Sequence, residues 1–321
     1  MSKIQETGDK VLANVERVIV GKHHEVRLAL VALLCRGHLL IEDVPGTGKT
    51  VLAKAIARSL GCSFRRIQFT PDLLPSDVTG LSIYNQKTQE FEFRPGPIMS
   101  QVVLADEINR ATPKTQSSLL EAMQEHQVTV ARQRYKLDPP FFVLATQNPL
   151  EMEGTYPLPE AQLDRFLFKV MVPFPSEDDL VQIMDRTTGA EGVTASKVCT
   201  AAEIVEMQRL ARAVPIAPHV TAYAVSLLAA THPDNARAPG LVREYVRYGG
   251  SPRGAQALVT AGKIYALLDG RFNVSTDDIR AVALPALRHR IILNFEGEAE
   301  GITSESAVRA ILDAVAVPTV E

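Results

Sequence analysis

The chain has 321 residues, of which 46% are hydrophobic and 22% are charged, and its formal net charge at pH 7 is -3. At about 150 residues per domain, this length predicts two domains, each large enough to bury its own core. The slightly negative charge argues against a chain built mainly to coat nucleic acid. The longest apolar run is too short to span a bilayer, and the first ten residues lack the apolar core of a signal peptide. We therefore expect a cytoplasmic protein without a membrane span.

The three cysteines, Cys35, Cys62 and Cys199, are widely spaced and form no C-x-x-C pair. Their spacing predicts neither a disulfide framework nor a zinc site. We interpret all three as buried thiols.

The first half of the chain alternates short apolar runs with helical stretches, which is the pattern of a parallel sheet covered by helices. Several of the runs are almost continuously apolar, as expected of strands that are buried on both faces. The expected fold class is therefore α/β with a five-stranded parallel sheet. The predicted strands are residues 38–43, 64–69, 101–106, 140–146 and 165–172.

Two segments between these strands have the two-residue alternation of β-hairpins. In residues 81–93, apolar side chains alternate on both sides of a polar turn, and we interpret the two phenylalanines of the second arm as hairpin core. Residues 128–137 repeat the pattern around an exposed tip with the sequence ARQR.

From about residue 175 the strand patterns stop and capped helices follow. Thr200-x-x-Glu203 has the form of a capping box, and Ser275-x-x-Asp278 resembles one. Further segments show helical apolar spacing, so this part of the chain is predicted to be all-helical. We expect an α/β domain over residues 1–174 and a helical lid domain over residues 175–321.

Residues 42–50, EDVPGTGKT, match three of the four fixed positions of the phosphate-binding pattern G-x-x-x-x-G-K-[ST], with Asp43 in place of its first glycine. A tight turn between a strand and a helix offers a phosphate closely spaced backbone N–H groups, a cation and the positive end of the helix dipole. Lys49 is expected to reach the β- and γ-phosphates, and Thr50 to bind Mg²⁺. The predicted nucleotide-binding residues of this loop are Pro45, Gly46, Thr47, Gly48, Lys49, Thr50 and Val51.

The third predicted strand ends in two acids. We predict that Asp106 holds Mg²⁺ through the water shell of the ion, and that Glu107 polarises the attacking water. Acids at strand ends are common, but a position on a second strand–helix unit after the phosphate loop strengthens this interpretation. At the end of the next strand, Asn148 could hydrogen-bond that water or the γ-phosphate. The residues alone favour the alternative, in which it forms a turn before Pro149.

Together these residues resemble the AAA+ ATPases, and closely the MoxR family within them. The resemblance covers residues 18–253 and is most specific in LPEAQLDRF (158–166) and GGSPRG (249–254). It implies a P-loop AAA+ core with ATP and Mg²⁺ as ligands. It also implies that Asn148 senses the γ-phosphate and that Arg165 is a finger that reaches the nucleotide of a neighbouring subunit.

The resemblance assigns further roles. Arg253 is expected to be the second sensor arginine, Val20 and Gly21 are expected to contact adenine, and Arg110 is a second candidate at the subunit interface. From the residues alone, Arg165 could instead be a surface residue, and Arg253 could cap the helical domain. The two predicted hairpins resemble the helix-2 and pre-sensor-1 inserts of the MoxR and magnesium-chelatase branch.

The function that the resemblance implies is ATP hydrolysis coupled to remodelling, maturation or activation of a client protein complex, including cofactor or metal insertion. It further implies a ring of six subunits that acts with a separate protein carrying a von Willebrand factor A-type domain. One alternative is a nucleic-acid motor related to the minichromosome-maintenance helicases, which the net charge disfavours. A second is a nucleotide-gated binding module, which the presence of Glu107 and Arg165 disfavours. A third, a small-molecule kinase, lacks an identifiable acceptor site.

Overall fold

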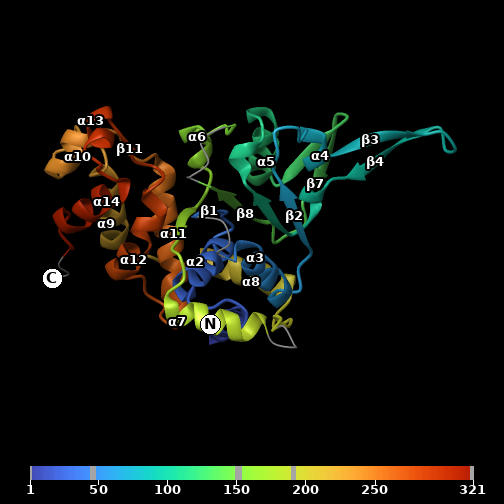
Figure 1. The fold of residues 1–321 in the computed structure, drawn as a ribbon. Coiled ribbons are helices and arrows are strands. Elements are labelled where there is room, and N and C mark those ends of the chain that lie inside the picture. Colours follow the sequence, from blue (N-terminus) through green and yellow to red (C-terminus); the bar gives the residue numbers. More distant parts are fainter. Residues whose placement is uncertain (1, 44–47, 149–153, 189–192, 319–321) are drawn as a thin grey trace. The chain divides into compact units, whose positions relative to one another are not determined.

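The structure is a computed structural model that describes residues 2–43, 48–148, 154–188 and 193–318 (Figure 1). The chain forms two compact units, which we call the sheet unit and the helical unit. The predicted domain boundary between residues 174 and 175 stays a prediction. The sheet unit comprises residues 7–159 and 170–206, and the helical unit comprises residues 1–6, 160–169 and 207–321.

The sheet unit contains the predicted five-stranded sheet, in the order β2-β5-β8-β1-β9 (Figure 1). The pairs β2–β5, β5–β8 and β1–β8 are parallel, and β5 is buried along its whole length, as its apolar sequence predicts. The predicted α/β fold class is confirmed. The strands are β1 Leu39–Asp43, β2 Phe64–Gln68, β5 Val102–Asp106, β8 Phe142–Gln147 and β9 Phe168–Val172.

The strand order places a ligand crevice beside β1. This strand lies between β8 and β9, so the order of the strands reverses there, and ligands of such sheets bind outside the carboxyl ends of the strands at that point. Helix α3 (Lys49–Ser59) begins six residues after β1 ends and packs on β5 and β2. Its apolar face buries Leu52 and Ile56, which anchors the helix start at the crevice.

The other helices that lie in the sheet unit follow the predicted apolar spacing. Helix α5 starts with a proline in its first turn, after Thr112, and buries Leu119 and Leu120. Helices α1 and α8 contribute residues to both units. These helices are α1 Ser2–Glu16, α2 His23–Leu34, α4 Pro75–Thr79, α5 Pro113–Glu125, α7 Glu177–Thr187 and α8 Ala201–Arg212, with 3-10 turns η1 Pro97–Met99 and η2 Ile108–Arg110.

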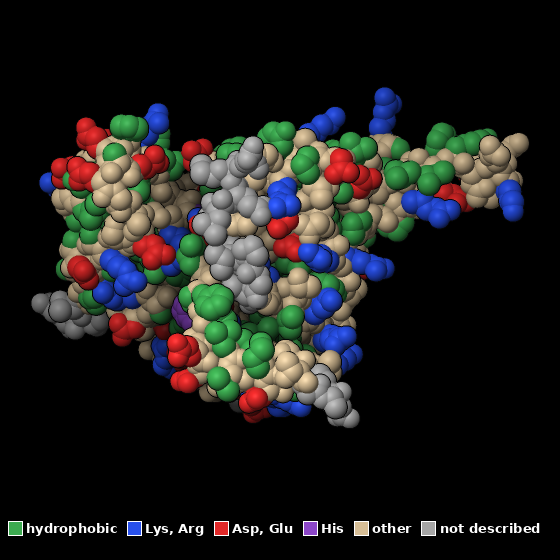
Figure 2. All heavy atoms as spheres, viewed as in Figure 1, with side chains coloured by type: hydrophobic (Ala, Val, Ile, Leu, Met, Phe, Trp, Pro, Cys, Tyr) green, Lys and Arg blue, Asp and Glu red, His purple; other side chains and the backbone are tan. Residues whose placement is uncertain are grey.

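Both predicted hairpins are present. β3 (Gly80–Asn85) pairs antiparallel with β4 (Glu90–Pro95), and β6 (Gln127–Val130) pairs antiparallel with β7 (Gln133–Lys136). The β6–β7 loop has two residues with positive φ, the turn conformation that matches the twist of a two-residue hairpin. In Figure 1 the β3–β4 hairpin extends away from the sheet, and hydrophobic side chains lie along this projection in Figure 2.

The interpretation of both hairpin phenylalanines as core is wrong for Phe91, which is 73% exposed. A projecting two-stranded hairpin has no second layer to cover this face. Among the described residues, the one aromatic ring that contacts Phe91 is that of Tyr84 on the paired strand, in an edge-on arrangement. Phe93 instead stacks on Tyr135 of β7, with ring centroids 3.8 Å apart. This stack joins the two hairpins.

The described part of the helical unit is mainly helical, as predicted. It also contains the first two residues of β9 and a short antiparallel pair, β10 (Val246–Tyr248) with β11 (Ile292–Leu293). Strands of two or three residues leave no periodicity that a sequence can reveal. Both predicted capping boxes form, at Thr200 with Glu203 and at Ser275 with Asp278. No helix in the described ranges is long and apolar enough to cross a membrane. The helices are α6 Glu160–Leu163, α9 Pro218–Ala229, α10 Gly240–Tyr245, α11 Pro252–Leu268, α12 Thr276–Leu287, α13 Phe295–Ala299 and α14 Ser304–Ala314.

The cysteines are free thiols, but only Cys199 is fully buried, whereas Cys35 and Cys62 are half-buried. The interpretation of all three as buried is therefore wrong for two of them. Burial raises the pKa of Cys62 to about 11 and that of Cys199 to about 12, which keeps both sulfurs protonated and unreactive at neutral pH.

His38 is a buried histidine at the start of β1 with both ring nitrogens satisfied. The Val143 N–H donates to Nδ1 at 3.1 Å, so the proton lies on Nε2, which donates to the Met123 carbonyl at 3.1 Å. Burial lowers the pKa of His38 to about 4. A second ring proton would face the Val143 N–H, so the folded sheet unit excludes it.

We expect the free energy of unfolding to decrease as the pH falls from about 6.5 to about 4, because the unfolded chain binds a proton that folded His38 excludes. At about pH 4, His38 accounts for about 3 kcal/mol of this decrease in the free energy of unfolding. Urea unfolding at a series of pH values measures the decrease. His38→Gln should have a smaller pH dependence between these limits, and an unchanged dependence would contradict the assignment.

Candidate functional site

Parallel pairing brings polar residues of three strands to one edge of the sheet. Asp106 ends β5, and the register sets Gln68 of β2 opposite to it. Thr146 of β8 lies one residue beyond the pair formed by Ala105 and Ala145. Residues that are about 40 positions apart in the chain therefore meet at the carboxyl ends of the strands.

The Asp106 carboxylate is nearly buried, with 8% of the residue exposed, and both of its oxygens accept hydrogen bonds. Oδ1 accepts from the Thr146 hydroxyl at 2.7 Å. Oδ2 accepts from Nε and Nη2 of Arg66 at 2.9 and 2.6 Å. Because a carboxylate oxygen has two lone pairs, the hydroxyl on Oδ1 still leaves room for a further ligand or water there.

Glu107 follows at once in a left-handed conformation, with φ 57° and ψ 49°. This conformation is uncommon for a residue other than glycine, and strained backbone of this kind gathers at functional sites. The Glu107 N–H donates to the Thr146 hydroxyl at 2.8 Å, and its Oε2 accepts from Gln68 Nε2 at 2.6 Å and lies 3.3 Å from Arg110 Nε. One threonine hydroxyl thus joins the two predicted acids.

The phosphate loop connects β1 to α3. Gly48 is the N-cap of α3 with φ 87° and ψ 14°. A Cβ there would meet no atom of the described residues within 4 Å, and the positive φ is itself a backbone conformation that favours glycine. Lys49 and Thr50 form the first turn of α3, and Val51 is 44% exposed. The predicted residues Pro45, Gly46 and Thr47 lie outside the described residues.

The turn that carries Val20 and Gly21 lies between α1 and α2 and is fixed against the start of α7. Gly21 has φ 69°, and a Cβ on it would lie 2.3 Å from Oδ2 of Asp179. Lys22 is buried, and its Nζ donates to the Pro173 carbonyl at 2.5 Å. The adenine contacts predicted for this turn stay predictions.

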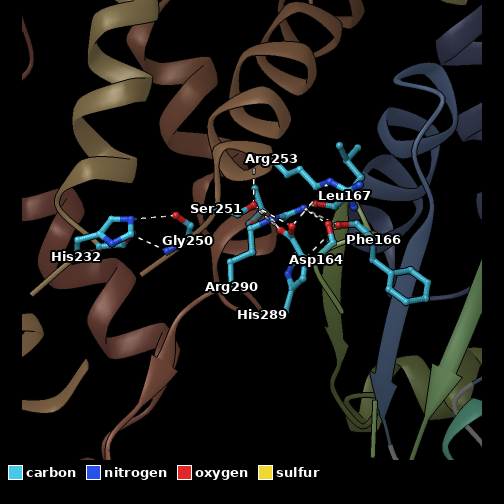
Figure 3. A network of polar contacts seen from close by, with 11 residues as sticks. Asp164, Phe166, Leu167, His232, Gly250, Ser251, Arg253, His289 and Arg290 are labelled. Carbon is cyan, nitrogen blue, oxygen red and sulfur yellow. Dashed lines mark hydrogen bonds and ion pairs between the residues drawn. The ribbon is translucent and has the colours of Figure 1, made fainter. Parts of the chain in front are cut away.

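In the helical unit, Asp164 precedes Arg165 in the chain, and its carboxylate lies beside Arg253 (Figure 3). Arg165 is its neighbour in the chain, and Arg253 lies in the first turn of α11 with its Nε 3.9 Å from Asp164 Oδ2. The hydroxyl of Ser251, the N-cap of α11, donates to the same carboxylate at 2.8 Å. In the sheet unit, Asn148 follows β8 and is 5% exposed. The roles predicted for these residues stay predictions.

The residues present fit Mg²⁺. The Thr50 hydroxyl and the Asp106 carboxylate are hard oxygen donors, and Mg²⁺ is held by one or two such groups together with phosphate oxygens. In the part of the chain that the structure describes, no group of three or more His, Cys, Asp and Glu side chains could hold a metal by itself. An ion at Asp106 would therefore need the phosphates of a nucleotide.

The prediction missed Arg66, Gln68 and Thr146. Gln68 and Thr146 stand at the ends of predicted strands, and that common position was a usable signal. Arg66 carried no such signal, because its guanidinium reaches Asp106 from a neighbouring strand only through the sheet register.

The chain matches known proteins over most of its length. Residues 38–168 match the ATPase family associated with various cellular activities (AAA), and residues 240–311 match the AAA lid domain. The chain is 50% identical to the protein YeaC of Bacillus subtilis (strain 168), over 96% of this chain and 94% of that protein. It is 40% identical to the chaperone MoxR1 of Mycobacterium tuberculosis, over 98% of this chain and 83% of that protein. The chain belongs to the MoxR family of AAA+ ATPases.

The solved structure of a candidate ATPase from Cytophaga hutchinsonii matches this MoxR-family chain with a TM-score of 0.93 at 39% identity, and covers 99% of this chain and 97% of that one. The likeness extends over both units. The resemblance predicted from LDRF and GGSPRG is confirmed, and membership in an ATPase family implies nucleotide binding.

Thr146→Val should lower the free energy of unfolding by about 1–3 kcal/mol, because it leaves the half-buried Glu107 N–H without its acceptor and removes a donor from the buried Asp106 carboxylate. We also expect a lower rate of ATP hydrolysis, since both acids lose their common partner. Thr146→Ser retains the hydroxyl and serves as the matched control. Urea unfolding and phosphate release would be measured for both variants. Equal behaviour of the Val and Ser variants would show that the hydroxyl does not position the acids.

Proposed function

We propose that this MoxR-family chain is a Mg²⁺-dependent ATPase whose nucleotide lies at the carboxyl edge of the sheet. The observation that supports it best is the hydrogen-bonded set of Asp106, Thr146 and Glu107 at that edge. The left-handed Gly48 at the start of α3 supports it independently, because a glycine in this conformation lets the loop turn its N–H groups toward a phosphate. Lys49 and Thr50 in the first turn of α3 are the proposed phosphate and metal ligands.

In the proposed reaction, water attacks the γ-phosphorus, the bond from that phosphorus to the bridging oxygen breaks, and ADP leaves with that oxygen. Glu107 polarises the water and accepts its proton. Gln68 and Arg110 both contact Glu107 Oε2 and so orient the carboxylate toward the edge. Bound Mg²⁺ would neutralise charge on the phosphate oxygens, with Thr50 and Asp106 as its protein partners.

Three further residues are proposed to stabilise charge on the γ-phosphate. Asn148 would act from the end of β8, Arg253 from the start of α11, and Arg165 in a neighbouring subunit. Phosphoryl transfer gains most from positive groups placed on the equatorial oxygens, and an arginine supplied by a second subunit makes the rate depend on assembly. We therefore propose a ring, with six subunits.

The proposed work of the ring is to remodel, mature or activate a client protein complex, with cofactor or metal insertion as one form, together with a von Willebrand factor A-type protein. The name of the Mycobacterium tuberculosis relative, a chaperone, supports a protein client for this chain. The formal charge of -3 supports a protein client over nucleic acid.

Glu107→Gln should bind ATP with nearly wild-type affinity but release phosphate at least about a hundredfold more slowly, because an amide cannot accept the proton of water. Lys49→Ala is the matched control and should lose ATP affinity instead. Binding of a fluorescent ATP analogue and a phosphate-release assay separate the two effects. If Glu107→Gln retains turnover, Glu107 is not the residue that polarises water.

Arg165→Ala should bind ATP but lose turnover by at least about tenfold, since the finger is proposed to act across subunits. Phosphate release per subunit from the wild-type protein should increase with protein concentration as rings assemble, and should stay low for the variant throughout. Turnover that is independent of concentration and survives the substitution would mean that each subunit has a self-contained site.

A further inference from the structure

Arg290 carries a buried charge that the proposed reaction does not use. It lies in the turn after α12, and its side chain is only 3% exposed. Burial lowers the pKa of its guanidinium, and the Asp164 carboxylate opposes that shift. A buried guanidinium has five N–H donors, and it is tolerated only when these donors find acceptors. The location of the acceptors therefore indicates what this arginine holds.

Among the described residues, four of the five acceptors around this guanidinium lie in one short segment (Figure 3). Nε donates to Asp164 Oδ1 at 2.8 Å, and Nη2 donates to the carbonyls of Asp164 and Phe166 at 3.1 and 2.7 Å. Nη1 donates to the Leu167 carbonyl at 3.2 Å, and to that of Ala286. The guanidinium thus holds the backbone on both sides of Arg165.

Two further groups hold the same segment. His289 Nε2 donates to the Phe166 carbonyl at 3.1 Å, and the Ser251 hydroxyl donates to the Asp164 carboxylate at 2.8 Å. In contrast, the described part of the chain offers no side-chain hydrogen bond or ion pair to Arg165, which is half-buried. The backbone that carries this arginine is therefore held at several points, whereas its guanidinium is not held by any described polar group.

The contacts also explain why β9 begins at Phe168 and not at residue 165 as predicted. The carbonyls of Phe166 and Leu167 accept from Arg290, so they do not take part in a strand ladder. The segment is instead a turn that continues α6, with the Arg165 N–H donating to the Gln162 carbonyl at 3.2 Å.

We propose that Arg290 is a positioning residue that presents Arg165 to the nucleotide of a neighbouring subunit, with Asp164 as the carboxylate that completes the clamp. This inference rests on the proposed role of Arg165 as a finger in trans. A finger gains its effect from precise placement on the γ-phosphate oxygens, and small displacements reduce the rate strongly. Arg290 acts on that placement through the backbone before and after Arg165.

The direct test is Arg290→Lys. The substitution keeps a positive charge, but an ammonium has three donors and no planar fork, so it cannot reach all the acceptors around residues 164–167. We expect phosphate release at saturating ATP to fall at least about tenfold, with ATP affinity within about twofold of wild type. Arg280→Lys is the matched control, because Arg280 contacts Tyr223 and Leu312 in the same unit. It should keep its turnover.

Mixed rings separate positioning of the finger from a general loss of structure. Lys49→Ala subunits lack a functional phosphate loop but carry an intact finger, so mixing them with Arg290→Lys subunits should restore hydrolysis above that of either variant alone. Mixtures of Arg290→Lys with Arg165→Ala should stay inactive, because neither variant supplies a working finger. If Arg290→Lys does not fold, Asp164→Asn takes its place in both mixtures, since it removes the carboxylate that Arg290 pairs with.

The mixture of Lys49→Ala with Arg165→Ala is the reference. If this mixture recovers and the mixture of Lys49→Ala with Arg290→Lys does not, Arg290 does not act through the finger. Recovery in the mixture of Arg290→Lys with Arg165→Ala would also overturn the inference. If the reference mixture itself stays inactive, the finger in trans is wrong, and the role of Arg290 in presenting it falls with it.

Discussion

Parallel pairing of β2, β5, β8 and β1 is the constraint on which the candidate site depends. Because the strands run in one direction, their carboxyl ends meet at one edge, where polar residues near the ends of β2, β5 and β8 form hydrogen bonds. Two acidic residues side by side at this edge repel each other, and neighbouring polar groups offset that repulsion. Thr146 bridges them, Arg66 neutralises Asp106, and Gln68 binds Glu107, so the edge holds its negative charge in a defined geometry.

In the helical unit, a charged side chain is likewise paired with residues that lie far away in the sequence. Asp164 and Arg290 are 126 positions apart, and their pairing gives a buried charge its partner while it fixes the turn that carries Arg165. Ser251 adds the start of α11 to the same carboxylate. The Asp164 carboxylate therefore connects the turn that carries Arg165 to Arg290 and to the start of α11, the helix that carries Arg253.

The hairpins differ from these sites because little packs against them. Phe93 is held by stacking on Tyr135, whereas Phe91 stays largely exposed on a projection with no covering layer. A large exposed aromatic side chain on such a projection is typical of a contact surface. The stacked rings of Phe93 and Tyr135 join the two hairpins.

The local sequence determined the elements whose causes lie in neighbouring residues. Apolar runs predicted the five strands, period-two alternation predicted both hairpins, and G-x-G-K-T before a helix with the acid pair 106–107 predicted the phosphate loop and the acidic edge. Tertiary structure alone decided the partners: Arg66 on Asp106, Thr146 between the acids, and Arg290 around the turn at 164–167. These contacts depend on strand register and on burial of charge across long separations, which no local spacing records. Burial of charge also explains why β9 is shorter than predicted. The buried Arg290 donates hydrogen bonds to backbone carbonyls that would otherwise be available for strand pairing.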